Sequence, residues 1–237
     1  MTTELTRRQI RWGIPDALLV WVGAGTIGVV ASMPVATAGD IDPLYTFGVL
    51  LPVQQLAVLG LLVVVSRAKG RGSLRRDFGL EVRAADARAL WLGPALQGLF
   101  WVALLPLIWL GGDTGNQRLV EDLERSREVL PVVFFAIGAV VMAPIVEETL
   151  YRGLLFRALL RRVSPGAAVF GSALIFAAVH FLGDPAAFRS LPALAALGVV
   201  LGRRALRTDS LSTAILIHAG FNLTTTVLVL LAPDNLS

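Results

Sequence analysis

Long apolar runs separated by short polar segments dominate this sequence. A helix that crosses a bilayer needs about 20 mostly apolar residues, and seven runs suggest such helices, the sixth being the shortest. They cover residues 17–38, 45–66, 89–110, 130–161, 165–182, 191–202 and 211–231. The pattern predicts an all-α fold, a polytopic membrane bundle of seven or eight helices.

Composition agrees with this pattern and excludes several kinds of site. Apolar residues make up 55% of the 237 residues and charged residues 16%, and the mean hydropathy is +0.72. The chain has no cysteine, which rules out disulfides, thiolate metal sites and a cysteine nucleophile.

The basic residues indicate an orientation in the membrane. Sixteen of the 21 Lys and Arg residues lie in four segments, 7–11, 67–88, 157–162 and 203–207, which share one side if the N-terminus is cytoplasmic. This is the positive-inside pattern, so the basic excess reflects topology, and we expect no nucleic-acid partner. Residues 111–128 form an acidic segment predicted to be a loop on the other side. All basic residues but one are Arg, which favours a bacterial source and therefore the plasma membrane.

The fourth run carries charges that a spanning helix normally avoids. Glu147, Glu148 and Arg152 lie within six residues of one another, and each charge at the bilayer centre costs roughly 2.5–3.5 kcal/mol. Glu148 and Arg152 are four residues apart on one helix face and can pair. Glu147 is turned about 100° from Glu148, so it is free to face another group.

Both histidines of the chain also lie in apolar runs. His180 is in the fifth run, and His218 shares a helix face with Asn222 in the seventh. Taken singly, each of these polar residues suits helix packing, as an interhelical hydrogen bond does; together they indicate a functional site. If both helices begin at the same membrane face, however, the two histidines differ in depth by roughly 12 Å at 1.5 Å per residue.

Two mechanisms fit this set of side chains. In one, Glu147 is a general base that deprotonates water with His180 as its partner, while His218 and Asn222 donate to the oxyanion. In the other, Glu147, His180 and His218 hold a divalent metal such as Zn²⁺ that activates the water. Both lead to hydrolysis, and the choice between metal and no metal stays open.

Three motifs stand in order along the chain. They are E-E-x-x-x-R at 147–152, F-x-x-x-H at 176–180 and H-x-x-x-N at 218–222. In these motifs the chain resembles the CAAX protease and bacteriocin-processing family of intramembrane endopeptidases, also called the ABI family. The resemblance implies that Glu147 and His180 activate water and that Glu148 and Arg152 orient and support them. It also implies that His218 and Asn222 stabilise the oxyanion or bind a metal.

The resemblance further implies a single membrane-embedded domain over residues 1–237. Residues 1–130 would hold the first three spans and 131–237 the catalytic core. The expected partners are the lipid bilayer and a peptide or protein substrate of the C-terminal or lipidated kind that CAAX prenyl proteases cut. Two other functions stay open. One is a non-catalytic immunity protein that binds a partner in the same pocket. The other is a transporter or proton relay, for which buried acids and histidines are equally suited.

Overall fold

The computed structural model describes residues 10–35, 42–109, 128–183, 188 and 190–231, and the regular structure in these ranges is helical throughout. This confirms the prediction of an all-α fold. The longer helices are α2 (Ile14–Ser32), α4 (Leu51–Lys69), α6 (Leu92–Trp109), α11 (Pro165–Gly183), α12 (Leu191–Thr208) and α13 (Ser212–Leu231). The predicted acidic loop lies outside the described residues up to position 127.

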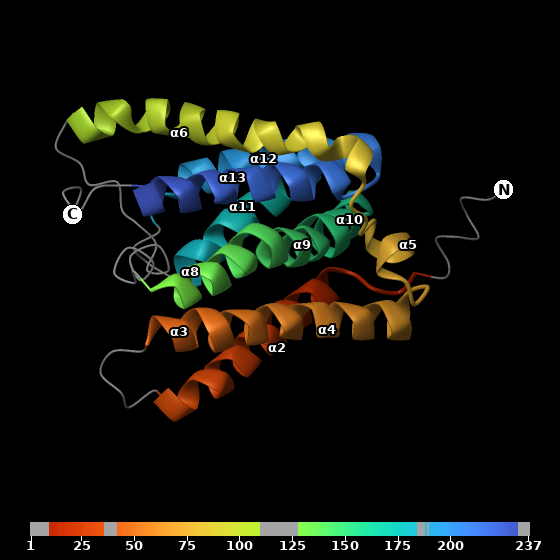
Figure 1. Cartoon of the computed structure of the whole chain (residues 1–237). Helices are drawn as coiled ribbons and strands as arrows, with labels where there is room; N and C mark the ends of the chain where they lie inside the picture. Colours follow the sequence, from red (N-terminus) through yellow and green to blue (C-terminus); the bar gives the residue numbers. More distant parts are fainter. Residues whose placement is uncertain (1–9, 36–41, 110–127, 184–187, 189, 232–237) are drawn as a thin grey trace.

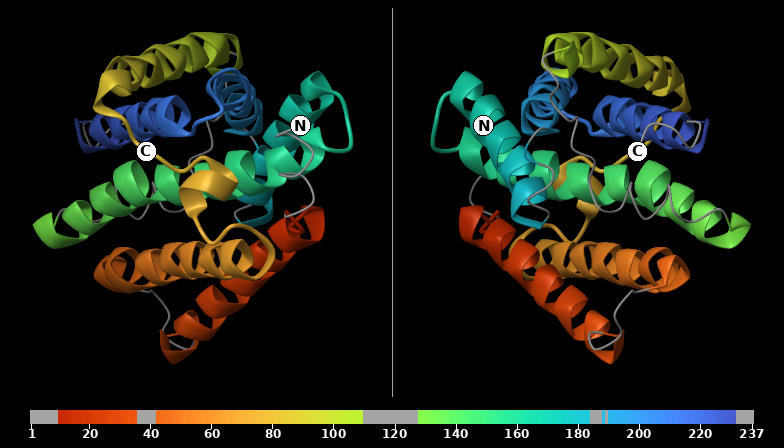
Figure 2. Two further views of the ribbon diagram at one scale, coloured as in Figure 1. Left: turned by 90° about the vertical axis from the view of Figure 1, so that its right-hand side faces the viewer. Right: turned by 90° about the vertical axis from the view of Figure 1, so that its left-hand side faces the viewer.

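One long helix runs through the middle of the bundle. It spans Val129–Leu160 without a break and is composed of α8 (Val129–Ala136), η4 (Ile137–Met142), α9 (Ala143–Glu148), η5 (Thr149–Leu155) and α10 (Phe156–Leu160). In Figure 1 the pair α2 and α4 lies on one side of this central helix, and α6 and α13 lie on the other. The views in Figure 2 show α11 and α12 closing a further side. Among the charged residues of the central helix, Glu148 and Arg152 are fully enclosed by protein.

Five of the described helical segments are long and apolar enough to cross a membrane. They are Ile14–Val35, Pro43–Lys69, Val129–Leu160, Pro165–Leu182 and Ser212–Leu231, so the chain is a polytopic helical membrane protein. The other two predicted spans correspond to α6 and α12, which are both helices of 18 residues. The last turns of α12 carry Arg203, Arg204 and Arg207, which leaves it a shorter apolar part. A total of seven spans stays a prediction.

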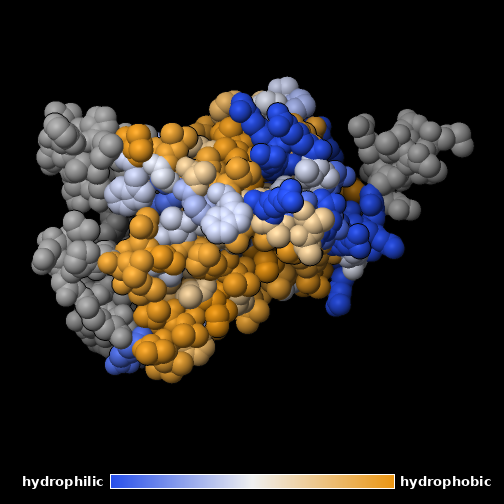
Figure 3. Space-filling model, turned by 45° about the horizontal axis from the view of Figure 1, so that its top comes forward, coloured by the Kyte–Doolittle hydropathy of each residue, from blue (hydrophilic) through white to orange (hydrophobic). Residues whose placement is uncertain are grey.

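The basic segments meet at one end of the bundle. Arg11 N–H donates to the Lys69 carbonyl at 2.8 Å, and Leu211 N–H donates to the Gly79 carbonyl at 3.0 Å. Figure 3 shows hydrophilic residues gathered at one end of a mostly apolar face. This arrangement agrees with the charge asymmetry of the sequence; which side of the membrane this end faces remains a prediction.

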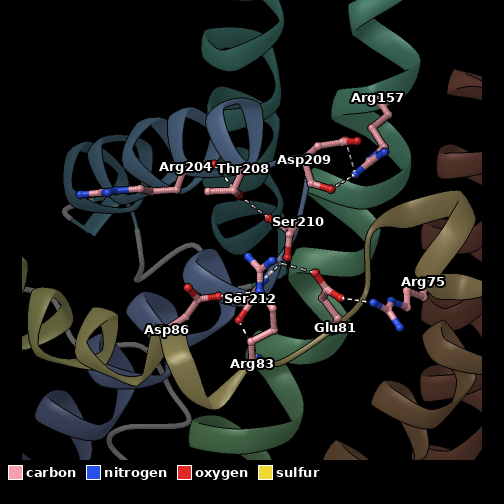
Figure 4. Close-up of polar contacts among 10 residues, drawn as sticks. All are labelled: Arg75, Glu81, Arg83, Asp86, Arg157, Arg204, Thr208, Asp209, Ser210 and Ser212. Atoms are coloured by element: carbon pink, nitrogen blue, oxygen red, sulfur yellow. Dashed lines mark hydrogen bonds and ion pairs between the residues drawn. The ribbon is translucent and has the colours of Figure 1, made fainter. Parts of the chain in front are cut away.

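A network of polar contacts joins the segment 75–86 to the start of α13 at the same end. The backbone N–H of Arg83 donates to the Ser212 hydroxyl at 2.9 Å, and the guanidinium of Arg83 pairs with Glu81 and Asp86 (Figure 4). Hydrogen bonds from the Ser212 hydroxyl and from Arg83 hold the pKa of Asp86 below its usual range. The network anchors the helix that carries His218.

The predicted basic loop 67–88 is more ordered than expected, because it contains α5 (Leu74–Phe78) and η3 (Ala84–Trp91). Ser73 caps α5 by accepting a hydrogen bond from the backbone N–H of Arg76. Gly79 ends α5 at φ +77°, where a side chain would be strained and would also collide with Arg157. The segment thereby turns onto the central helix.

Residues of the segment before α2 and of helices α2 and α4 share a core with the second half of the chain. Trp12, Val20 and Leu62 belong to the same buried cluster as Leu154 and Phe176. Between helices in a bilayer, where lipid tails are as apolar as the side chains, close van der Waals packing of such residues is a main stabilising contribution. Helices α2 and α4 therefore support the central helix directly.

Helices α6 and α13 touch through glycines. A Cβ added at Gly93 would come within 3.0 Å of backbone atoms of Ile217, Gly220 and Phe221, whereas one at Gly98 would meet nothing within 4 Å. We expect Gly93→Ala to lower the free energy of unfolding by about 1–3 kcal/mol, because backbone must move to admit the methyl group. Gly98→Ala, on the same helix, is the matched control and should not destabilise. Equal stability of the two variants in mixed-micelle unfolding would refute this close approach.

Candidate functional site

The central helix changes its winding on both sides of the Glu147–Glu148 pair. The turns at Ile137–Met142 and Thr149–Leu155 are π-helical, and such turns often occur at functional sites. Pro144 sits between them. It lacks an N–H and its ring clashes with the preceding turn of a regular α-helix, which accounts for the wider turn before it.

Glu148 and Arg152 form a fully buried ion pair, as their spacing predicts. Arg152 Nη1 lies 2.9 Å from Glu148 Oε1, and both side chains have 0% exposure. Arg152 Nη2 also donates to the Gly198 carbonyl on α12 at 3.2 Å. The same carboxylate oxygen of Glu148 lies 3.0 Å from His218 Nδ1, so it accepts from two donors.

This contact fixes the tautomer of the neutral His218 ring. Because Glu148 accepts from Nδ1–H, the neutral ring keeps its lone pair on Nε2. Nε2 lies 3.8 Å from Glu147 Oε2. Among the described residues it is His218, and not His180, that comes within 4 Å of a Glu147 carboxylate oxygen.

Of the two adjacent acids, Glu147 is the one for which no hydrogen-bond donor is found among the described residues. Its side chain is 29% exposed, yet Oε2 is buried and has no hydrogen-bond partner among the described residues. Leaving a buried carboxylate oxygen unpaired is costly. The arrangement therefore keeps Glu147 ready to accept a proton or a hydrogen bond from a molecule that enters the site.

Phe176 brings the two histidines together. Its ring lies edge-on to both imidazoles, with centroids 4.8 Å from His180 and 5.8 Å from His218. The Arg152 guanidinium lies 4.5 Å from the centre of the same ring. Both imidazoles therefore pack against the same aromatic ring, although residue counts from the sequence boundaries had placed them at different depths.

His180 is oriented by its own helix. Its Nδ1 lies 2.8 Å from the Phe176 carbonyl, which can only accept, so Nδ1–H donates and the neutral ring carries its lone pair on Nε2. An imidazole held in this way can accept a proton or bind a ligand through Nε2.

Asn222 makes a contact that the sequence did not predict. Its Nδ2 donates to the Ala139 carbonyl in η4 at 2.8 Å. The side chain thus links α13 to the wide turn of the central helix, and one amide hydrogen remains for another acceptor.

The residues do not gather as a metal site would require. Within the ranges that the structure describes, no three His, Asp or Glu side chains are grouped so that they could hold one ion. The expected set of Glu147, His180 and His218 is therefore not arranged as three ligands of one ion.

Some residues of the site were missed in the sequence. Gly198 contributes only a backbone carbonyl, and no sequence signal could have indicated it. Gln55 on α4 is buried and donates to the Gly138 carbonyl at 3.0 Å. An amide in an apolar span is a detectable signal, because polar groups are rare there.

Comparison with known families covers the part of the chain that contains this geometry. Residues 129–224 match the family described as type II CAAX prenyl endopeptidase Rce1-like. This segment, which is less than half of the chain, is similar to that family. The match includes all six candidate residues and confirms the resemblance seen in the three motifs. It supports a CAAX-type intramembrane protease in general. No curated protein and no solved structure matches the chain at a significant level.

Proposed function

We propose that the protein is an intramembrane endopeptidase in which Glu147 takes a proton from the water that attacks a peptide carbonyl. The observation that carries the proposal is the unpaired Oε2 of Glu147, which lies 3.8 Å from His218 Nε2 inside an Rce1-like segment. A carboxylate without donors in a shielded site is suited to general-base work.

In the proposed reaction Glu147 both accepts the proton from water and returns it to the leaving amine. As a water O–H proton passes to Glu147, the water oxygen bonds to the carbonyl carbon and an oxyanion forms. The tetrahedral intermediate then expels the amine, which leaves with the proton that Glu147 accepted. His180, with its lone pair on Nε2, helps to hold the water.

His218 and Asn222 have the oxyanion role in this proposal. His218 Nδ1–H already donates to Glu148, so only a protonated ring can donate from Nε2 to the oxyanion. Asn222 can donate its second amide hydrogen. Glu148 and Arg152 orient His218 and do not meet the substrate.

The substrate class follows from the family match alone. We propose a membrane-embedded or C-terminal peptide segment, including lipidated ones, that reaches the site from the bilayer. Glu147 is partly exposed, whereas Glu148 and Arg152 are sealed, which fits an access path to one acid only.

A cleavage assay tests the proposal. Purified protein in nanodiscs is incubated with a peptide library that contains prenylated and unmodified C-terminal peptides, and products are identified by mass spectrometry with and without a chelator. We expect defined cleavage by the wild type and a loss of about 10²-fold or more in His180→Ala. Wild-type rates in His180→Ala would overturn the role of His180.

The same experiment separates the other functions. An immunity protein would bind its partner without forming products, and Glu147→Gln would keep that binding. A transporter or proton relay would instead show uptake into liposomes that depends on a pH gradient. Absence of any product from wild-type protein would refute the peptidase proposal.

A further inference from the structure

The wide turn before Glu147 leaves a backbone carbonyl without its usual partner. Ala143 N–H donates to the Gly138 carbonyl, five residues back. Continuing this pattern, residue 144 would donate to the Ala139 carbonyl, but Pro144 has no N–H. A buried carbonyl without a donor is costly, so the turn needs a partner from outside the helix.

Two amide side chains from other helices meet this turn. Asn222 Nδ2 on α13 donates to the Ala139 carbonyl at 2.8 Å, and Gln55 Nε2 on α4 donates to the Gly138 carbonyl at 3.0 Å. Gln55 has only 6% of its surface exposed. α4 approaches closely here, because a Cβ at position 138 would press on the Leu51 side chain of α4.

The winding of this turn decides where Glu147 points. Each residue of an α-helix adds about 100° of rotation, and a π-helical turn accommodates an extra residue. All side chains that follow η4 are therefore rotated relative to a regular helix. If the turn relaxed, Glu147 would turn away from His218 while the helix itself survived.

We propose that Gln55 is a positioning residue which, together with Asn222, holds the η4 turn in its wide form and so aims Glu147 at His218. The inference rests on the proposed function for its kinetic readout only. It extends the site to the second span, outside the segment that matches the Rce1-like family. It also assigns a distinct role to Gln55 on α4. Gln54, the preceding residue, is exposed.

Kinetic comparison of three variants tests the proposal. We expect Gln55→Leu to lower kcat about tenfold with KM unchanged, the size expected for one lost buried hydrogen bond. Gln54→Leu, the same change at the exposed neighbour, should leave kcat unchanged. Gln55→Glu keeps a donor only while its carboxyl carries a proton. Its kcat relative to wild type should therefore fall as pH rises, a trend that Gln55→Leu should not show.

A second readout does not depend on activity. The chain has two histidines, so ¹⁵N-histidine labelling gives two sets of ring signals in detergent micelles. Gln55→Leu should shift the His218 ring nitrogens, and Gln54→Leu should not. Unchanged His218 signals and unchanged kcat in folded Gln55→Leu would overturn the proposal. If wild-type protein cleaves nothing, the peptidase proposal fails while the ring signals still decide the role of Gln55.

Discussion

Glu147→Gln should abolish peptide cleavage while the protein still folds and inserts. The amide is nearly the same size as the carboxyl group but cannot accept the proton of the attacking water, and general-base catalysis contributes about 10²- to 10⁴-fold. We expect kcat to fall by that factor. Because Glu147 Oε2 has no hydrogen-bond partner among the described residues, the change breaks no other contact of that oxygen. Product formation by mass spectrometry in nanodiscs measures the loss.

The matched control is Glu128→Gln. Glu128 is exposed and stands at the start of the same helix, so the change removes one negative charge without touching the site. Its kcat should equal that of the wild type. Glu147→Gln retaining more than about a tenth of wild-type activity would exclude Glu147 as the base and leave His180 or His218 as the only candidates.

Arg152→Met should be the most destabilising single change in the site. It removes the strongest partner of Glu148, and removing one member of a buried ion pair costs about 3–5 kcal/mol. The guanidinium also lies against Phe176 and donates to the Gly198 carbonyl, so packing is lost as well. Equilibrium unfolding in mixed micelles measures the effect.

Arg157→Met is the control on the same helix. Arg157 pairs with Asp209, whose side chain is 88% exposed, and exposed pairs contribute about 0–1 kcal/mol. The double variant Glu148→Gln/Arg152→Met should recover much of the lost stability, since no uncompensated charge remains. It should nevertheless stay inactive, because His218 loses its charged anchor. A double variant no more stable than Arg152→Met would show that packing, and not charge, carries the effect.

The pairings within single helices could be predicted from spacing. Residues four apart lie on one helix face, which was enough for the Glu148–Arg152 contact and for placing Glu147 on a different face. The distances between helices could not be obtained in this way. Counting residues from assumed membrane boundaries placed His180 and His218 at different depths, whereas both rings pack on Phe176. Helices in a bundle tilt and start at different levels, so a count along each chain segment does not measure depth.

By itself the sequence determined that this is an all-helical membrane protein. It also predicted six polar residues as candidates for one site, in motifs that resemble those of an intramembrane protease family. Apolar run length and the rarity of buried charge are properties of each segment alone, so they can be read without a structure. Only the tertiary structure decided that His218 faces Glu147, and that Asn222 and Gln55 bind the wide turn before Pro144. These features depend on contacts between residues as far apart in sequence as Gln55 and Gly138. Such contacts arise from the packing of helices against one another, which no local pattern encodes.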